Sequence, residues 1–506
     1  MPTSSAKSRI AVSVLANGLR GLLSFTTVLI LARGLGTERY GNFAFLLGTF
    51  MALRALLSMG IPEAFYTFMS QKPRGGIFLT IYAGWNLVQF LLPLFFIGIF
   101  FPDEWVNWIW VGQKRELVLL SFVAVFLQQQ GWHIMVQIGE STRLTYRVQI
   151  MNLLIALTHL LAICSFWIVD LLSLQVIFII ITAEYVVAIV AGVKVFKVSK
   201  LPRGSFDFQK VLREYFSFCS PLVIFSLLGF AYEFFDRWLL QNFGGSEEQA
   251  LYEIGYRFST VGLLVTTAML NIFWKEFAEA RETKNLARMR IIYTKASRFL
   301  FAFGAIVSGF LIPWSKEIVQ VFLGPAYSAG VPVLIIMLVF SIYLGAGQLN
   351  TTLMYAAKKT KEHFFFSTIG MALSLPLSYF LLAPNEAMIP GLELGAIGMA
   401  IKKTIYTALL LYFFVWWIHR NYSWKHDWAY LVVGLAGPLI LGWAAHKAAI
   451  VLIAPVLSGL IFSIGIAFIF YIVMVGIMIW IVPWFMGLQR DEFLTHLKKP
   501  FKIAGR

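Results

Sequence analysis

Residues 17–48 read NGLRGLLSFTTVLILARGLGTERYGNFAFLLG. Two apolar runs flank a short polar turn that is rich in glycine, RGLGTERYG. Each run continues outside the quoted residues to the length of about 20 residues that a helix needs to cross a bilayer. Backbone groups in lipid have no water to bond, so runs of this length are expected to be helices. The stretch therefore predicts two transmembrane helices, roughly 10–32 and 42–67, joined by a tight turn.

The same apolar pattern recurs along all 506 residues. The chain is 59% hydrophobic and 13% charged, with a mean hydropathy of +0.77, which leaves too little polar surface for a soluble protein. We therefore predict an all-α polytopic membrane protein with about 14 transmembrane helices. The further spans are expected at roughly 76–101, 116–138, 148–169, 172–195, 214–242, 250–273, 298–321, 331–356, 364–383, 393–418, 428–446 and 453–484.

The net charge of +16 is distributed unevenly between the two sides of the predicted membrane. About 29 of the 41 Lys and Arg residues fall in loops on the side of the N terminus, and about six on the opposite side. This asymmetry is the positive-inside pattern, so it argues against a nucleic-acid partner. It predicts a multi-pass protein of the cell inner membrane with both termini in the cytoplasm.

The loops are too short to hold a catalytic domain. The two longest predicted cytoplasmic stretches, roughly 196–213 and 274–297, have about 20 residues each, and we expect the second to be a surface helix between spans eight and nine. No P-loop or HExxH motif occurs, and Cys164 and Cys219 form no metal-binding pair. We therefore expect a transporter rather than an enzyme, with no cofactor and with H⁺ or Na⁺ as the coupling ion if transport is uphill.

A short internal repeat links the two halves of the chain. Residues 33–45, RGLGTERYGNFAF, are matched by residues 242–258, NFGGSEEQALYEIGYRF. The offset of about six helices predicts parallel repeats around an axis along the membrane normal, with the substrate path between them. We therefore divide the chain into an N-lobe, 1–195, a C-lobe, 196–418, and two additional helices with a cytoplasmic tail, 419–506.

Polar side chains recur at steps of three and four in spans one, two, seven and eight, so each set lies on one face of its helix. Four such helices, two at the start of each half, predict a water-filled central cavity. The lining residues that we single out are Ser13, Asn17, Ser24, Thr260 and Asn271, with Lys402 and Lys403 in span twelve.

Arg20 and Arg54 have no carboxylate three or four positions away on their own helices. An unpaired guanidinium inside a membrane costs at least about 2.5–3.5 kcal/mol, so each arginine needs a partner elsewhere. Glu63 or Glu184 is one candidate for that partner. Alternatively, the two arginines hold an anionic group in the cavity, and the planar, permanently charged guanidinium suits phosphate.

The carboxylates in the spans are candidates for ion coupling. Glu233, Asp236 and Glu253 are expected near the periplasmic ends of their helices, and Glu184 is isolated in span six. A structural role is equally open for two of them, because Glu233 lies four residues before Arg237, and Glu253 four residues before Arg257.

Two further polar groups also allow a structural interpretation. Lys402 and Lys403 could mark a misplaced boundary of span twelve. The amides of Gln128, Gln129 and Gln130, with His133 nearby, are expected to bond neighbouring helices rather than a ligand.

The opening residues 17–48 resemble the start of the polysaccharide-transporter family, the Wzx-like flippases of the multidrug/oligosaccharidyl-lipid/polysaccharide exporter superfamily. Residues 322–334, FLGPAYSAGVPVL, and 391–401, GLELGAIGMAI, fit the same family. The resemblance implies two six-helix lobes around a cationic cavity, two further helices, and a polyprenyl-pyrophosphate-linked oligosaccharide as substrate. It also implies that Arg20, Arg54 and Arg257 correspond, helix by helix, to cavity arginines of the related lipid II flippase.

We therefore expect a flippase that moves such a lipid, carrying an O-antigen (lipopolysaccharide) or other surface-polysaccharide repeat unit, from the cytoplasmic to the periplasmic leaflet. Arg20, Arg54 and Arg257 would bind the pyrophosphate during alternating access. The expected partners are the lipid-linked glycan, membrane lipids and the polysaccharide polymerase machinery.

Three alternatives stay open at this point. They are a lipid II flippase, an ion-coupled drug or metabolite antiporter of the same superfamily, and a membrane glycan polymerase or ligase. The last is disfavoured because the longest predicted periplasmic loop, roughly 102–115, is too short to roof a catalytic pocket.

Overall fold

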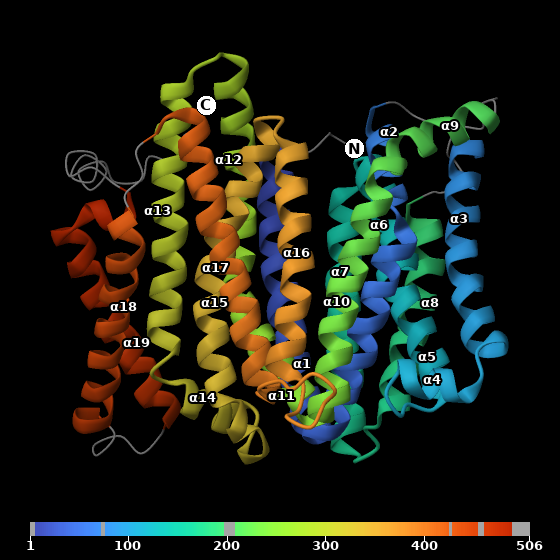
Figure 1. Cartoon of the computed structure of the whole chain (residues 1–506), viewed down its shortest axis with the longest axis horizontal. Helices are drawn as coiled ribbons and strands as arrows, with labels where there is room; N and C mark the ends of the chain where they lie inside the picture. Colours follow the sequence, from blue (N-terminus) through green and yellow to red (C-terminus); the bar gives the residue numbers. More distant parts are fainter. Residues whose placement is uncertain (1–5, 72–75, 197–207, 425–427, 454–459, 488–506) are drawn as a thin grey trace. The chain divides into compact units, whose positions relative to one another are not determined.

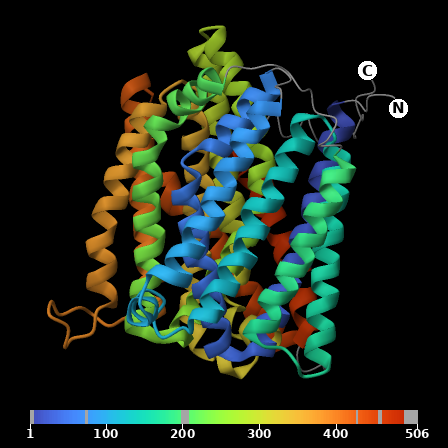
Figure 2. The ribbon, with the colours of Figure 1, turned by 90° about the vertical axis from the view of Figure 1, so that its right-hand side faces the viewer.

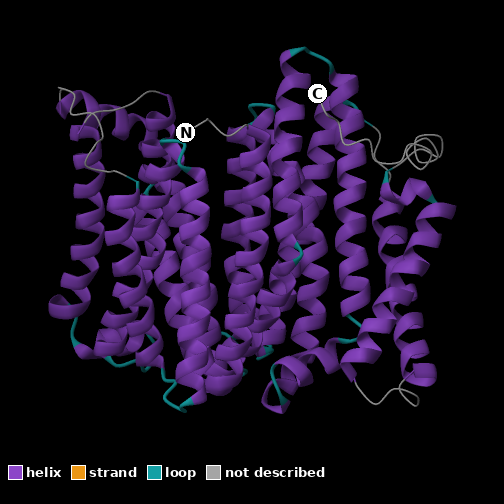
Figure 3. Ribbon diagram, turned by 180° about the vertical axis from the view of Figure 1, so that it is seen from behind, coloured by secondary structure: helices purple, strands orange, loops and turns teal. Residues whose placement is uncertain are grey.

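The computed structural model describes residues 6–71, 76–196, 208–424, 428–453 and 460–487. Over these ranges the regular elements are helices, with no strand, which confirms the predicted all-α class (Figure 3). The chain divides into two compact units. Unit 1 comprises Met1–Glu253 with Met371–Met399, and unit 2 comprises Ile254–Gly370 with Ala400–Arg506. The lobe boundaries expected from the sequence stay a prediction.

Long helices dominate both units (Figure 1). Those that begin in unit 1 are α1 (Ala6–Ser58), α2 (Ile61–Gln71), α3 (Gly76–Phe95), α4 (Asp103–Ile109), α5 (Arg115–Phe126), α6 (Trp132–Ser141), α7 (Thr145–Ile168), α8 (Leu174–Val195), α9 (Phe208–Cys219), α10 (Val223–Leu239), α11 (Gly245–Val261) and α17 (Gly395–Tyr422). Those that begin in unit 2 are α12 (Leu263–Glu282), α13 (Leu286–Leu311), α14 (Ser315–Phe322), α15 (Val331–Ala356), α16 (Thr360–Leu382), α18 (Trp428–Ala448) and α19 (Leu460–Ile481).

The lengths and hydropathies of these helices fit a multi-pass membrane protein. Among the described residues, 11 helices could cross a membrane, or 12 if the bent pair Phe208–Cys219 and Val223–Val261 is one span. The first, Leu15–Ser58, has 44 residues. A straight helix of that length would be about 66 Å long, twice the hydrocarbon thickness of a bilayer. It therefore covers most of both of the first two predicted spans, and the total of fourteen stays a prediction.

A single glycine divides α1 into those two spans. Gly36 has a φ of 73° and a ψ of 175°, a backbone conformation that is essentially restricted to glycine. Gly245, at the junction of the π-helical turn Leu240–Gly244 with α11, has a φ of 79° and a ψ of −177°. The two glycines occupy the same position in the two halves of the sequence repeat, so the repeat is present in the backbone as well as in the sequence.

The two glycine turns pack against each other within unit 1. Thr37 Oγ1 donates a hydrogen bond to Glu247 Oε1 at 3.3 Å. A Cβ atom at Gly41 would lie only 1.7 Å from the backbone oxygen of Ser246, so only glycine allows these two backbone segments to come this close. α1 and α10 also pack along each other (Figure 1). The hairpin α1 and the hairpin α10–α11 are therefore joined at their turns.

The exposed face of α3 is apolar, as contact with lipid requires. Leu87, Leu91 and Phe95 on α3, and Ile99 in the π-helical turn Phe96–Phe100 that continues it, recur at every fourth position, and all four side chains are exposed. This helix is the blue one that faces the viewer in Figure 2. An exposed apolar stripe of this kind is expected where a helix contacts hydrocarbon.

Two predicted spans have different boundaries in the structure. The second was expected to reach residue 67, but α1 ends at Ser58 because Met59 and Gly60 both have positive φ values. The seventh was expected to begin at residue 214, which lies inside α9. The 3-10 turn Ser220–Leu222 separates α9 from α10, and the two bend by 53°. A proline in that turn cannot donate a helical hydrogen bond.

The expectation of a separate surface helix between spans eight and nine is wrong. α12 continues to Glu282 and α13 begins at Leu286, so the two helices meet in a tight turn. Lys284 in that turn has a φ of 53°, which ends the helical path. The Asn285 side chain then accepts a hydrogen bond from the backbone N–H of Arg288 and caps α13.

Replacing Gly36 or Gly245 by alanine should lower the melting temperature of the purified protein. The added methyl group would meet no atom within 4 Å at either position, so its cost is backbone strain of about 1–3 kcal/mol. Gly84 in α3 is the matched control, since its Cβ position is equally open and its φ is not positive. Equal thermal unfolding of Gly36→Ala and Gly84→Ala would contradict the role assigned to the glycine turn.

Candidate functional site

Arg54 is anchored in unit 1 by a network of side-chain amides. Its Nε atom donates to Gln130 Oε1 at 3.0 Å, and Gln130 Nε2 donates to Asn86 Oδ1 at 2.5 Å. Gln130 belongs to the π-helical turn Leu127–Gly131 between α5 and α6. Such turns insert an extra residue into a helix and are frequent at functional sites. The network therefore joins α1, α3 and this turn.

A second set of hydrogen bonds continues the network toward α2 and α6. Tyr82 Oη donates to Gln137 Oε1 at 2.7 Å, and Gln137 Nε2 donates to the backbone oxygen of Pro62 at 3.1 Å. Gln137 also lies 3.0 Å from His133 Nε2. We call Arg54, Gln130, Asn86, Tyr82 and Gln137 the amide network. Its amides bond neighbouring helices, as the sequence predicted for Gln130.

The amide network leaves most of the Arg54 guanidinium available. Within the described residues, Nε is the only atom of Arg54 with a hydrogen bond, and no ion pair to Arg54 or Arg20 is formed. Glu63 is an electrostatic neighbour of Arg54, as the sequence suggested. Glu184 instead lies 2.7 Å from His159 Nδ1. The two arginines therefore keep donors that a ligand can use.

Arg20 lies on α1 with an exposed side chain. It is an electrostatic neighbour of Tyr185 on α8, whose hydroxyl also interacts with Gln128. Gln128 belongs to the same π-helical turn as Gln130. The surroundings of both arginines thus converge on one turn, Leu127–Gly131.

The acidic candidates lie close to the glycine turns and are held by specific partners. Glu253 Oε2 lies 3.2 Å from Arg237 Nη1, and this ion pair joins α11 to α10. Asp236 Oδ1 accepts a hydrogen bond from Ser378 Oγ on α16 at 2.6 Å. Both carboxylates are buried, with exposed fractions of 2% and 6%. Each therefore links two helices in this structure.

Asn42 completes this set of contacts between the hairpins. Its Oδ1 atom accepts hydrogen bonds from Gln113 Nε2 at 2.9 Å and from Gln241 Nε2 at 3.0 Å. We call Asn42, Gln113, Asp236, Arg237, Gln241 and Glu253 the hairpin cluster.

The remaining candidates are dispersed. Asn17 is half-buried and Ser24 exposed on α1, Glu233 is exposed on α10, and Thr260 donates to the Arg257 backbone oxygen of its own helix. Lys402 is fully buried and Lys403 half-buried, and both lie inside α17 rather than at a boundary. The side chains of Ser13 and Asn271 lie outside the described residues. The role of all these residues in lining a cavity stays a prediction.

Sequence reasoning missed several partners in these networks. Asn86, Tyr82, His159 and Ser378 lie in predicted spans, and polar residues there are a signal that the sequence offers. Which residue each one bonds depends on how helices far apart in the chain are placed side by side. Gln130 and Asn86, for example, are 44 positions apart.

Replacing Gln130 by leucine should destabilise the protein and loosen Arg54. Gln130 is fully buried, and its loss would leave both Arg54 Nε and Asn86 Oδ1 without this partner, at about 1–3 kcal/mol for each buried group. Gln129→Leu is the control, because the Gln129 side chain bonds only its neighbour Gln128 within the described hydrogen bonds. Thermal unfolding of both variants checks this, and equal melting temperatures would contradict the anchoring role.

Solved structures share this fold. The lipid II flippase MurJ in an inward closed conformation superposes with a TM-score of 0.68 at 13% identity, covering 93% of this chain and 99% of that one. A MOP superfamily transporter from Pyrococcus furiosus gives 0.55 at 14% identity, covering 83% and 97%. An inward-facing MATE family multidrug transporter gives 0.57 at 14%, covering 80% and 94%. At these identities the likeness concerns the fold alone.

No curated protein matches the chain in sequence. The sequence model of one family, described as polysaccharide biosynthesis protein, matches residues 7–274. This stretch includes both glycine turns, the amide network and the whole hairpin cluster. The resemblance seen in the opening residues is thereby confirmed. Because the match covers more than half of the chain, the protein belongs to the polysaccharide biosynthesis protein family.

Proposed function

We propose that this membrane protein is a flippase for a polyprenyl-pyrophosphate-linked oligosaccharide, the repeat unit of an O-antigen or another surface polysaccharide. It moves this lipid from the cytoplasmic to the periplasmic leaflet of the inner membrane by alternating access, with both termini in the cytoplasm. Arg20 and Arg54 bind the pyrophosphate, and Arg257 is a candidate third ligand. Family membership and the loop charge asymmetry support this proposal.

The observation that carries the proposal is the anchoring of Arg54. Gln130 holds the guanidinium through Nε, which leaves the two terminal nitrogens to bind a phosphate oxygen pair. A neutral amide anchor orients the arginine without neutralising its charge. Glu63 is an electrostatic neighbour of Arg54 but forms no ion pair with it within the described residues, so no direct carboxylate partner cancels the charge.

The energetics of the substrate explain why it needs a protein. Each sugar hydroxyl that enters an apolar medium without a partner costs about 2–7 kcal/mol, and an oligosaccharide has many hydroxyls. The pyrophosphate adds charge, whose desolvation costs more. A polar path with fixed cations replaces both hydration shells, while the polyprenyl tail stays in lipid.

Arg54→Gln should slow transport of a fluorescent lipid-linked oligosaccharide in proteoliposomes by about 10- to 100-fold, the equivalent of one lost charge-assisted hydrogen bond of about 1.5–3 kcal/mol. Arg20→Gln should act in the same direction. Arg39→Gln is the control, because Arg39 is exposed beside the Gly36 turn. In cells depleted of the protein, mass spectrometry of extracted lipids should find that the glycosylated carrier accumulates.

The same experiments separate the alternatives. If Arg20→Glu and Arg54→Glu left transport intact while depleted cells became sensitive to toxic cations, the antiporter would replace the flippase. An unchanged carrier pool in depleted cells would also contradict the proposal. The sugars on an accumulated carrier would distinguish a surface polysaccharide from peptidoglycan.

We also propose H⁺ or Na⁺ coupling through the half-buried carboxylate Glu184 and the buried carboxylates Asp236 and Glu253, with Glu233 as a weaker candidate. Glu184→Gln should abolish the response of transport to an imposed ion gradient, because a neutral amide neither takes up a proton nor attracts a cation. The readout is the transport rate in proteoliposomes with and without each gradient. If Glu184→Gln and Asp236→Asn both kept the wild-type gradient response, these two residues would have no coupling role.

A further inference from the structure

α9 is an amphipathic helix that lies beside α2 and α3 in unit 1. Its apolar residues occupy two adjoining stripes, one buried and one exposed, and its polar residues occupy the remaining arc. A helix of this kind, with cations on its polar arc, is typical of the membrane–water interface. None of the functions considered above uses it.

The buried stripe fixes α9 to the core of unit 1. Val211, Tyr215 and Cys219, spaced by four residues, are all buried. The Tyr215 ring stacks on Phe78 of α3 at a centroid distance of 4.8 Å, and it meets Phe68 of α2 edge-on at 6.3 Å. The position of the helix is therefore set by aromatic packing on two other helices.

The exposed stripe has no such partner within the described residues. Phe208, Leu212 and Phe216 are also spaced by four, and Phe216 is 74% exposed. Each is followed in the chain by a polar residue, Gln209, Arg213 or Ser217, so the exposed stripe lies between the buried stripe and the polar arc. In a membrane protein, acyl chains are the natural contact for such a band.

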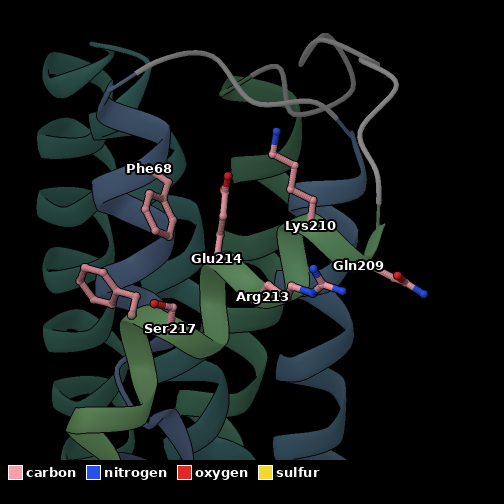
Figure 4. A pocket seen from close by; sticks show the side chains of 7 residues that line it. Phe68, Gln209, Lys210, Arg213, Glu214 and Ser217 are labelled. Atoms are coloured by element: carbon pink, nitrogen blue, oxygen red, sulfur yellow. The ribbon is translucent and has the colours of Figure 1, made fainter.

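The polar arc lines a pocket of about 820 Å³ (Figure 4). Its walls are Phe68 of α2 and, from α9, Gln209, Lys210, Arg213, Glu214, Ser217 and Phe218. In Figure 4, Lys210 and Glu214 extend on the same side of α9, and Arg213 extends from the helix beside them. The volume is within the range of pockets that bind small ligands.

The pocket carries a net positive charge. Lys210 and Arg213 supply two cations and Glu214 one carboxylate, which leaves one positive charge. Both cations are exposed, and neither has an ion pair in the part of the chain that the structure describes.

From this arrangement we infer that the α9 pocket binds the phosphate head group of an anionic phospholipid from the cytoplasmic leaflet. Lys210 and Arg213 contact the phosphate, Ser217 offers a hydroxyl, and the acyl chains lie along Phe208, Leu212 and Phe216. The adjoining apolar stripe favours a lipid over a free phosphate ion, and the cytoplasmic leaflet is the anionic one. The inference rests on the proposed orientation, with both termini in the cytoplasm. It does not depend on any step of the proposed transport cycle.

The test is native mass spectrometry of the full-length protein in neutral detergent, titrated with phosphatidylglycerol or with phosphatidylcholine of the same acyl chains. Wild-type protein should bind phosphatidylglycerol more tightly. The double variant Lys210→Gln/Arg213→Gln should lose this preference, with about thirtyfold weaker binding, because each cation near the lipid surface contributes about fivefold. Glu214→Gln should strengthen binding, since it removes the opposing carboxylate.

Two matched variants separate a specific pocket from general charge. Lys210→Arg/Arg213→Lys keeps both charges and should bind like the wild type. Lys275→Gln/Arg290→Gln removes two exposed cations from the predicted cytoplasmic ends of α12 and α13 and should leave binding unchanged. Equal binding of the two phospholipids by wild-type protein, or an equal loss in the two charge-removing variants, would overturn the inference.

Titrations with farnesyl diphosphate and with inorganic phosphate test two other occupants of the pocket. If Lys210→Gln/Arg213→Gln abolished binding of farnesyl diphosphate but not of phosphatidylglycerol, the pocket would bind the carrier lipid instead. If inorganic phosphate bound as tightly as phosphatidylglycerol, the apolar stripe would contribute nothing to binding, and the pocket would be a site for free phosphate. Thermal unfolding of each variant controls for folding. Since no transport is measured, this inference can fail while the flippase proposal stands, and the reverse also holds.

Discussion

A guanidinium or an amide inside a bilayer must find its hydrogen-bond partner within the protein, because hydrocarbon offers none. Arg54 meets this constraint through Gln130, and Gln130 meets it through Asn86 on a third element. The π-helical turn Leu127–Gly131 brings Gln130 into this position. A chain of neutral amides therefore stabilises a charged group without cancelling its charge, which is the condition for that group to bind an anionic ligand as well.

The carboxylates satisfy the same constraint in another way. Glu253 and Asp236 each accept from a side chain on another helix, so the hairpin cluster connects elements that are distant in sequence. Close packing of the glycine turns places these elements near enough to do so. In the proposed transport cycle such contacts would have to break and form again, and individual hydrogen bonds of about 1 kcal/mol net suit reversible contacts better than a continuous apolar interface would.

The helical class and the approximate positions of the spans were predictable because apolar length is a local property of the sequence. Gly36 and Gly245 were visible as a repeat for the same reason. The breaks at Gly60 and Lys284 were not, since either residue could equally continue a helix until its backbone conformation is known. At the candidate site, Arg20 and Arg54 were evident as charges without local partners. Their neighbours Gln130 and Tyr185 depend on helix packing, which a single sequence does not encode in any short pattern.

The one-residue turn at Gly36 restricts where insertions and deletions can occur in this protein family. Surface loops ordinarily absorb insertions and are the places where proteases cut. Here the turn has no spare residues, and its neighbour Gly41 touches the backbone of the second hairpin. Length variation and proteolytic nicking should therefore be concentrated at the other connections of the chain. An epitope tag or a reporter domain inserted to map topology would be tolerated there and not between residues 33 and 41.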